Sequence, residues 1–303
     1  MITRDIQAFL RQARRCAPDF GPATAKAAFL VSPDGFARAE QSAVDNRYMA
    51  QAGQFDAGRA QAQHRALHQA LSSEVPVFRF AGDPQTPDAV FPNNVFGTAP
   101  GRLVVGKMRH EVRAREAARE DIRGFFARVM GYEVVDLSTQ LHPCELTGAL
   151  VIDRARGLGF CGLSERCDEA GARLMHEAFR LRATLMFDLA AGEYHTTVVL
   201  AVLAGRAALI RGHGFASQAA AEAIASVYWP HAVSLGHDEH AAFAANAIAL
   251  DPAKVWMSQG AQAALSAASA GALQAAGFGV RSVALDAIEA AGGSLRCCVA
   301  EVF

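Results

Sequence analysis

A cysteine near the end of the sequence has the surroundings of a nucleophile. Cys297 follows the glycine pair Gly292 and Gly293 and comes directly after Arg296. Glycines allow a bend or a close approach of substrate, and a positive charge beside sulfur favours the reactive thiolate. The run is otherwise apolar, which predicts a terminal strand with Cys297 and Cys298 on opposite faces. A small buried hydrophobic residue is the alternative interpretation of Cys297.

A thiol nucleophile needs a proton shuttle and an acid that orients the shuttle. His195 stands at the start of an apolar strand-like run, and Glu145 immediately precedes another. A histidine with only structural hydrogen bonds and a glutamate in a plain surface turn are the alternatives. His195 and Glu145 are therefore the candidates for the two roles.

Two further segments carry polar residues suited to binding a substrate. Asn93 and Asn94 lie in the proline-containing segment 86–98, together with Asp88. This pattern predicts a rigid loop that presents amide groups, although Asx turns alone would also explain the asparagines. Arg166 lies between a strand end and a helix start, where a guanidinium is well placed to bind a substrate carboxylate; a surface ion pair is its commoner role.

Metal and cofactor signatures are weak in this sequence. The residues His237, Asp238, Glu239 and His240 have metal-ligand types without the HExxH spacing. The six cysteines form no CxxC pair, and no phosphate-binding glycine loop occurs. We therefore expect free thiols, no metal and no cofactor. A metal hydrolase centred on His237 and His240 is the alternative, and a chelator would inhibit it.

The composition is that of a globular protein with a large core, since 51% of the 303 residues are hydrophobic and the net charge is -1. No basic excess exists to bind nucleic acid. No apolar run reaches the roughly 18 to 20 residues of a membrane helix, and Met1–Asp5 lacks a signal-peptide pattern. We expect a cytoplasmic protein whose partner is a small molecule, not a nucleic acid or a membrane, and a homodimer is a possible assembly.

Short strand-like runs and longer helical runs alternate along the chain. Strands are expected at 27–31, 75–80, 102–105, 133–137, 149–153, 159–163, 184–187, 198–201, 207–210, 255–257 and 280–283 and at the C-terminus, and helices at 51–72, 109–130, 168–181, 215–228 and 259–276. This pattern indicates about five α/β units of roughly 50 to 60 residues. A doubly wound parallel sheet would alternate strands and helices one for one, whereas 149–153 and 159–163 look like a hairpin. Repetition around an axis fits better.

Six motifs, taken in order, resemble the guanidine-modifying superfamily of dimethylarginine dimethylaminohydrolases, arginine deiminases and amidinotransferases, and most of all its citrulline-utilization hydrolase branch. They are PDAVFPNN, CELTGALVID, GLSERCDE, EYHTTVVL, AANAIAL and GGSLRCC. The similarity runs from about Ala28 to Phe303, with weaker parts at 31–33 and 45–46. Val95 stands where the family has Trp, and Thr197 where it has Asn.

The resemblance implies an α/β fold, a five-bladed propeller of ββαβ modules (a pentein) around a central substrate channel. It also implies roles for five residues: Cys297 as nucleophile, His195 as general acid and base, Glu145 as the carboxylate that orients the imidazole, Arg166 as the ligand of a substrate carboxylate and Asp88 as a polar residue of the pocket. Residues 2–15 show helical spacing. We therefore expect a helical extension over 1–25 and one catalytic domain over 26–303.

Asn93 and Asn94 stand where dimethylarginine hydrolases resembling this chain have acidic residues that hold the guanidinium. A buried guanidinium needs a carboxylate partner, whereas two asparagines match a neutral ureido group. We expect a cysteine-dependent hydrolase that cleaves a C-N bond of a ureido or guanidino amino acid, with a citrulline-like substrate favoured. Dimethylarginine dimethylaminohydrolase, arginine deiminase or amidinotransferase activity is one alternative. A non-catalytic binding protein on the same fold is another, although Cys, His and Glu are all retained.

Overall fold

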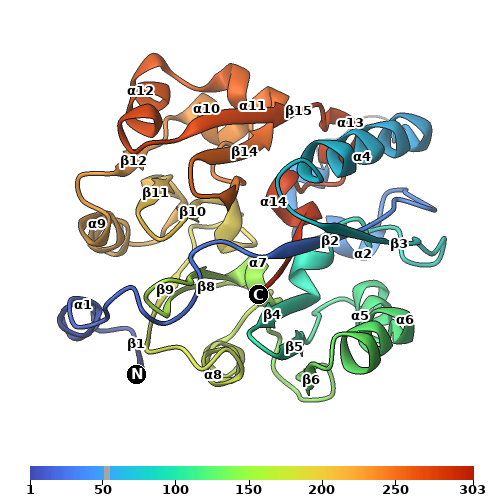
Figure 1. Cartoon of the computed structure of the whole chain (residues 1–303), viewed down its shortest axis with the longest axis horizontal. Coiled ribbons are helices and arrows are strands. Elements are labelled where there is room, and N and C mark those ends of the chain that lie inside the picture. The colour runs from blue at the N-terminus through green and yellow to red at the C-terminus, as the bar shows by residue number, and fades with distance from the viewer. Residues whose placement is uncertain (51–54) are drawn as a thin grey trace.

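The computed structural model describes residues 1–50 and 55–303. Within these residues the strands form five sheets, and each sheet contains one antiparallel and one parallel pair of strands, with a second parallel pair in the four-stranded sheet. Figure 1 shows the sheets set around the middle of the molecule, with the larger helices toward the outside. The expected mixed α/β fold is confirmed.

The same order of strands is used in all five sheets. The antiparallel pairs are β4 (Phe96–Ala99) with β5 (Arg102–Val105), β7 (Leu150–Asp153) with β8 (Leu158–Leu163), β10 (Leu200–Leu203) with β11 (Ala207–Ile210), β13 (Ile248–Asp251) with β14 (Lys254–Ser258), and β16 (Ala300–Val302) with β2 (Ala27–Val31). The strands parallel to the middle one are β6 (Glu133–Asp136), β9 (Ala183–Asp188), β12 (Ala232–Ser234), β15 (Gly279–Val283) and β3 (Val77–Phe80).

Helices carry the chain between the two parallel strands of each sheet, as such crossovers require. They are α5 (Glu111–Ala117) and α6 (Glu120–Gly124), α8 (Glu169–Ala178), α9 (Gln218–Val227), α11 (Gln259–Ala264) and α12 (Ala267–Ala275), and α2 (Glu40–Ala43), α3 (Arg47–Ala50) and α4 (Ala57–Leu71). The connections also contain α10 (His237–Ala241), α13 (Asp286–Glu289), the 3-10 turn η4 (Gly212–Gly214) and the π-helical turn η2 (Phe125–Val129). No described helix is long and apolar enough to cross a membrane.

A short helical turn comes before the first strand of four of the sheets. These turns are η1 (Pro92–Asn94), α7 (Leu146–Ala149), η3 (Thr196–Val198) and α14 (Leu295–Cys298). The first strands begin at residues 96, 150, 200, 248 and 300, so the repeat length agrees with the one expected from the sequence. The candidate catalytic residues lie in or next to these turns.

Two long expected helices are broken, and three strands of the repeated units were missed. The expected helix 259–276 is two helices because Ser266 accepts a hydrogen bond from the backbone N-H of Ser269 and starts α12. The expected helix 109–130 divides into α5, α6 and η2. The missed strands are β4, β12 and β13. Of the expected helix 51–72, residues 51–54 lie outside the described residues, and α4 covers 57–71.

The N-terminal segment packs against the second sheet. Residues of β1 (Ile2–Thr3) pair in parallel with β9, so the helix expected over 2–15 is confined to α1 (Ile6–Ala13). Asp5 caps α1, and Phe9 is fully buried against Phe160 with 5.7 Å between ring centroids. The division into residues 1–25 and 26–303 stays a prediction.

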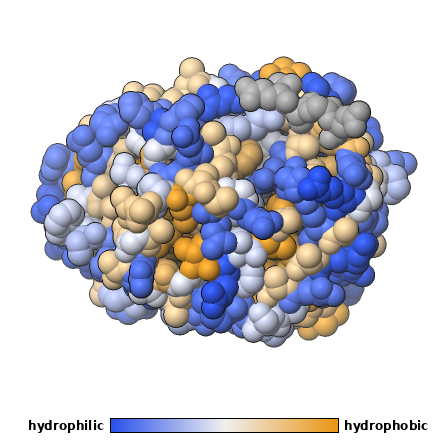
Figure 2. Space-filling model, turned by 90° about the horizontal axis from the view of Figure 1, so that it is seen from above, coloured by the Kyte–Doolittle hydropathy of each residue, from blue (hydrophilic) through white to orange (hydrophobic). Residues whose placement is uncertain are grey.

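Apolar side chains from neighbouring sheets and their helices form the core clusters between them. Hydrophilic residues cover much of the face seen in Figure 2, and the apolar areas on that face are separate. The C-terminal end lies in the middle of the molecule in Figure 1. There β16 is held by Thr98, whose hydroxyl donates to the carbonyl of Glu301 at 2.8 Å and accepts from the N-H of Phe303 at 2.9 Å.

The variant Thr98→Val should lower the free energy of unfolding by about 1 to 3 kcal/mol, because it leaves two buried backbone groups without a partner while keeping the side-chain shape. Urea denaturation measures the loss. The matched control is Thr139→Val at an exposed position, where a change within about 0.5 kcal/mol is expected. Equal stability of the two variants would contradict this role of Thr98.

Candidate active site

A small cavity lies among the ends of several turns, and Cys297 lines it. The other lining residues are Ser42, Asn46, Met49, Asp88, Phe91, Asn94, Arg113, Arg166, Tyr194, Ala291, Gly292 and Gly293. They come from segments that are far apart in the sequence. Four of the seven candidate residues therefore line the same cavity: Cys297, Arg166, Asp88 and Asn94.

Cys297 lies on the helical turn α14 and not on a strand, so the expected placement by strand alternation is wrong. The N-H groups of Cys297 and Cys298 both donate to the carbonyl of Ser294, which closes the turn. Cys298 is fully buried outside the cavity lining, and burial raises the pKa of its thiol. The expected bend at the glycine pair is present, because Gly292 has φ +75° and a Cβ there would lie 2.4 Å from Asn46 Nδ2.

Arg296 does not supply positive charge to the Cys297 sulfur. Its guanidinium donates to the carboxylate of Glu301 at 2.8 Å and to the carbonyl of Val299 at 2.8 Å. It lines a different cavity, and the Cys297 cavity does not include it. The helical turn therefore points the Arg296 guanidinium away from the Cys297 sulfur, although the two residues are adjacent in the sequence.

Glu145 and His195 form a fully buried pair, with 2.8 Å between Glu145 Oε2 and His195 Nε2. Burial raises the pKa of Glu145, but the charge of Arg166 and the hydrogen bond with His195 outweigh it and hold that pKa well below the ordinary range. The carboxylate is therefore ionised and accepts from Nε2-H. Burial lowers the pKa of His195, against the opposing effect of Glu145. In the neutral ring Nδ1 is unprotonated, and it has no hydrogen-bond partner in the described chain.

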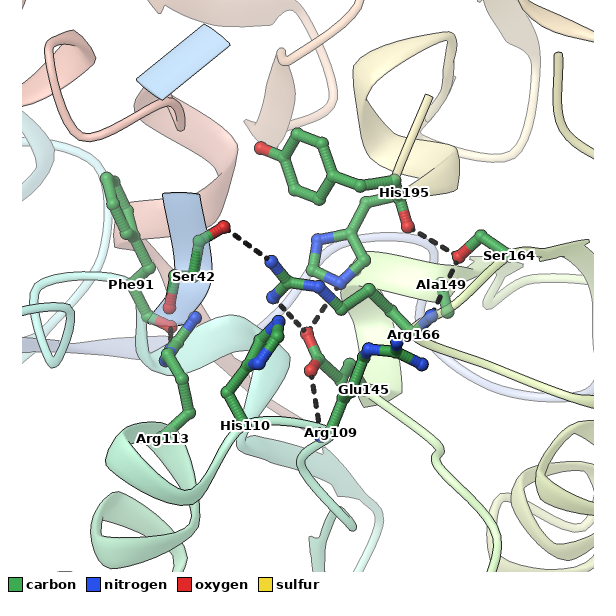
Figure 3. Close-up of polar contacts among 12 residues, drawn as sticks. Ser42, Phe91, Arg109, His110, Arg113, Glu145, Ala149, Ser164, Arg166 and His195 are labelled. Carbon is green, nitrogen blue, oxygen red and sulfur yellow. Dashed lines mark hydrogen bonds and ion pairs between the residues drawn. The ribbon is translucent and has the colours of Figure 1, made fainter. Parts of the chain in front are cut away.

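Arg166 lines the cavity and also contacts this pair. Figure 3 shows its guanidinium between Glu145 and Ser42. Its Nη1 donates to Glu145 Oε2 at 3.2 Å, its Nε lies 3.0 and 3.1 Å from the two oxygens of Asp45, and its Nη2 binds Asp45 and the carbonyl of Ser42. Four of the five guanidinium N-H groups thus have protein partners. A bidentate contact with a substrate carboxylate, as expected for Arg166, would have to replace some of them.

Asp88 is the unpaired acid of the cavity. It is buried, its Oδ1 has no hydrogen-bond partner among the described residues, and burial raises its pKa against the effect of Arg113. Arg113 itself donates through Nε and Nη2 to Glu116 at 2.8 and 2.9 Å and through Nη2 to the carbonyl of Phe91 at 3.0 Å. The unpaired Oδ1 of Asp88 can therefore accept a hydrogen bond from a ligand.

The two asparagines have different surroundings. Asn94 lines the cavity, whereas Asn93 is fully buried beside it and its carbonyl accepts from the hydroxyl of Thr147 at 2.9 Å. Gly148 lies between the groups of the site, because a Cβ there would be 2.9 Å from both Asn94 Oδ1 and His195 Nδ1. A glycine is therefore needed at 148 for the imidazole and the Asn94 amide to come this close.

Several residues of the site were not assigned from the sequence. Asp45 and Asn46 were noted only as a weak part of the resemblance, yet Asp45 binds Arg166 and Asn46 lines the cavity. Asn246 was part of the motif AANAIAL, and it contacts Cys297. The signal for Asn246 was one polar residue inside an apolar run, whereas Asp45 and Asn46 stand next to Arg47 in a polar segment that gives no such signal.

The residues His237 to His240 serve the packing of α10. Glu239 accepts from the N-H groups of Gly236 and Ser266, and His240 Nε2 lies 2.9 Å from Glu193 Oε1. Residues 1–50 and 55–303 contain no group of three or more His, Cys, Asp or Glu side chains that could hold a metal. All six cysteines are free and buried.

Comparisons with known proteins concern the family and the fold of the chain. A family model described as N,N dimethylarginine dimethylhydrolase, eukaryotic, matches residues 32–303. No match was found among curated protein sequences. The N-terminal domain of ArgZ, an arginine dihydrolase from the ornithine-ammonia cycle in cyanobacteria, solved as a cysteine-to-serine mutant bound to substrate, has a TM-score of 0.79 at 21% identity, over 91% of this chain and 97% of that chain.

Two further structures are similar to the chain. Full-length apo ArgZ has a TM-score of 0.80 at 22% identity, and the match covers 91% of this chain and 40% of that chain. A dimethylarginine dimethylaminohydrolase adduct with S-methyl-L-thiocitrulline has a TM-score of 0.69 at 19% identity, over 91% and 99%. At these identities the structures support the fold alone.

The fold and the cavity, with its cysteine and the buried histidine and glutamate joined to it through Arg166, define a protein of the guanidine-modifying pentein superfamily, as the sequence predicted. Within it the chain belongs to the family of N,N dimethylarginine dimethylhydrolases, since the family model matches most of its length.

Treatment of the native protein with iodoacetamide should label Cys297 before Cys298, because only the first thiol lines the cavity. Mass spectrometry of the digested protein locates the adduct. The variant Cys298→Ser should keep the fast labelling, and Cys297→Ser should lose it. Faster labelling of Cys298 in the wild-type protein is the outcome that contradicts the assignment.

Proposed function

We propose that the protein is a cysteine-dependent hydrolase that cleaves a C-N bond of a guanidino amino acid. The observation that carries this proposal is one cavity lined by the Cys297 thiol, the unpaired Asp88 carboxylate and Arg166, which in turn holds the Glu145 and His195 pair. The matched family and the similar arginine dihydrolase support the same reaction class. Hydrolysis of a guanidino C-N bond needs a nucleophile, a proton carrier and an anchor for the cation.

The reaction has two steps. Cys297 attacks the central guanidino carbon and a C-S bond forms, while neutral His195 takes the thiol proton and passes it to the leaving nitrogen, so that the C-N bond breaks and ammonia or an amine leaves. His195 then takes a proton from water, the oxygen adds to the same carbon, the C-S bond breaks, and the proton on His195 returns to the sulfur as the ureido product leaves. A covalent intermediate divides one difficult hydrolysis into two easier steps, and Glu145 keeps the imidazole oriented throughout.

A guanidinium fits the charge of the cavity better than the ureido group favoured by the asparagines. That expectation assumed a missing carboxylate, and Asp88 supplies one in the cavity beside Asn94. A bound cation would restore the charge balance of Asp88, which burial alone leaves unfavourable. Citrulline is the second candidate, because Asn94 is neutral and because the raised pKa of Asp88 favours its uncharged form.

We also infer that the five sheets act as the blades of a five-bladed propeller with the cavity at its centre. The common strand order of the sheets and their placement around the middle of the molecule support this arrangement. In it, residues 26–303 form one catalytic domain, and residues 1–25 attach to the second sheet. The competing proposal, a binding protein without chemistry, predicts ligand binding without release of ammonia or an amine.

Purified protein should release ammonia or an amine from arginine or a methylated arginine with a higher kcat/KM than from citrulline. Asp88→Asn should lower kcat/KM for the cationic substrate by about 100-fold or more, because a buried unpaired charge costs about 3 to 5 kcal/mol, and should change citrulline turnover less. Asn94→Asp should shift the preference further toward arginine. A higher kcat/KM for citrulline than for these cationic substrates in the wild-type protein would contradict the guanidino assignment and favour a ureido substrate.

Glu145→Gln should lower kcat by about 100-fold to 10,000-fold, because the proton carrier is no longer oriented. Neutral His195 is the form that can accept a proton, so the rate falls as the pH drops through the pKa of His195. Glu145 raises that pKa against burial, and its removal should therefore move the acid limb of the pH profile to lower pH. The exposed Glu169→Gln is the control and should change neither quantity. A shift of the limb to higher pH would contradict this coupling.

A further inference from the structure

One polar residue of the site stands close before the first strand of each sheet, at a nearly constant interval along the chain. Asn94, Glu145, His195 and Cys297 account for four of the five sheets. The interval from 94 to 145 is 51 and from 145 to 195 is 50, and the remaining 102 residues up to 297 divide into 51 and 51 at Asn246. Asn246 comes two residues before β13, the first strand of the sheet without an assigned residue.

The side-chain hydrogen bonds of Asn246 all go to the segments that carry the candidate nucleophile and proton carrier. Its side chain is fully buried. Nδ2 donates to Cys297 Sγ at 3.3 Å and to the carbonyl of Thr197, two residues after His195, at 3.1 Å. Oδ1 accepts from the N-H of Cys297 at 3.3 Å. The backbone carbonyl of Asn246 accepts from the N-H of Arg296 at 3.3 Å.

This set of contacts requires an amide. Two donor N-H groups and one acceptor oxygen are used at once, which neither a carboxylate nor a hydroxyl provides. Within residues 1–50 and 55–303, the Asn246 amide is the donor to the Cys297 sulfur, and the nearest arginine in sequence is bound to Glu301. A hydrogen bond strengthens when its acceptor becomes charged, so this contact stabilises the thiolate more than the thiol.

We propose that Asn246 is a positioning residue that holds the Cys297 side chain toward the cavity and stabilises its thiolate. It does so through one amide that also fixes the turn following His195. This inference rests on the proposed role of Cys297 as nucleophile. A purely structural Asn246 would affect stability, but it would leave the reactivity of the folded protein unchanged.

The test is the rate of alkylation of Cys297 by iodoacetamide, followed by mass spectrometry over a range of pH. Asn246→Asp keeps the size and the acceptor oxygen but loses both donors. Its alkylation at neutral pH should be slower by about 10-fold to 100-fold, as expected for loss of a hydrogen bond to a charged group, and its pH profile should move to higher pH. Asn246→Ala, which adds no negative charge, should shift in the same direction by a smaller amount.

Gln63→Glu is the matched control. Gln63 is another buried amide, which accepts from the N-H of Ala287 at 3.0 Å and donates to Asp286 at 2.7 Å, outside the cavity lining. This variant should lose thermal stability and keep the alkylation profile of the wild type. Turnover should show a lower kcat for Asn246→Asp with KM changed less, because the amide contacts the sulfur and does not line the substrate cavity.

Alkylation of folded Asn246→Asp and Asn246→Ala at the wild-type rate and pH profile would overturn the inference. Should Asn246→Asp fail to fold, Asn246→Ser gives the same comparison, with one hydroxyl donor in place of the amide and an intermediate rate expected. The proposed function fails by a different result, namely full turnover by Cys297→Ser. The two failures are therefore distinguishable.

Discussion

The ionised carboxylate of Glu145, fully buried, sets the main requirement of the site. Removing one partner of a buried ion pair typically costs about 3 to 5 kcal/mol, so the carboxylate needs donors on every side. It receives them from the imidazole of His195, the guanidinium of Arg166 and the N-H of Arg109, the last at 3.1 Å. Because Arg166 is itself buried, a second carboxylate is needed, and Asp45 provides it.

This chain of paired charges determines what surrounds the cavity. Asp45 lies between α2 and α3, so the segment that supplies Ser42, Asn46 and Met49 is fixed by the same guanidinium that holds Glu145. Burial raises the pKa of Asp45, but the hydrogen bond and charge of Arg166 outweigh it, so the net shift is downward. The walls of the cavity and the orientation of the imidazole are therefore one electrostatic unit. Asp88 remains outside this unit and stays available for a ligand.

The sequence was sufficient for the class of fold and for the residue types of the site. Short apolar runs predicted the middle strands, such as β5 and β11, because those strands are largely buried on both faces. The strand β4 was missed because its residues Phe96, Gly97, Thr98 and Ala99 include a glycine and follow a proline-containing turn. The position of β4 depends on its pairing with β5. The residues of β4 alone do not carry this information.

Contacts between distant residues explain what the sequence could not show about the site itself. Arg296 precedes Cys297 in the sequence, but a helical turn and Glu301 direct its charge away, and no local pattern announces that turn. Arg166 was expected to face a ligand, and its partner Asp45 is 121 residues away in the chain. The spacing of 50 residues between Glu145 and His195 and of 102 residues between His195 and Cys297, in contrast, was visible in the sequence and reflects the repeated sheets.

The pairing of β16 with β2 also has a consequence for the order of folding. The register joins Ala300 to Phe29, almost the whole length of the chain, while the other first strands pair with segments only a few residues away. Contacts of such high sequence separation form slowly, because the entropy of a long loop is lost before the contact stabilises the chain. The turn that carries Cys297 is attached to β16. We therefore expect the Cys297 sulfur to enter its cavity late in folding, so that partly folded chains expose this thiol.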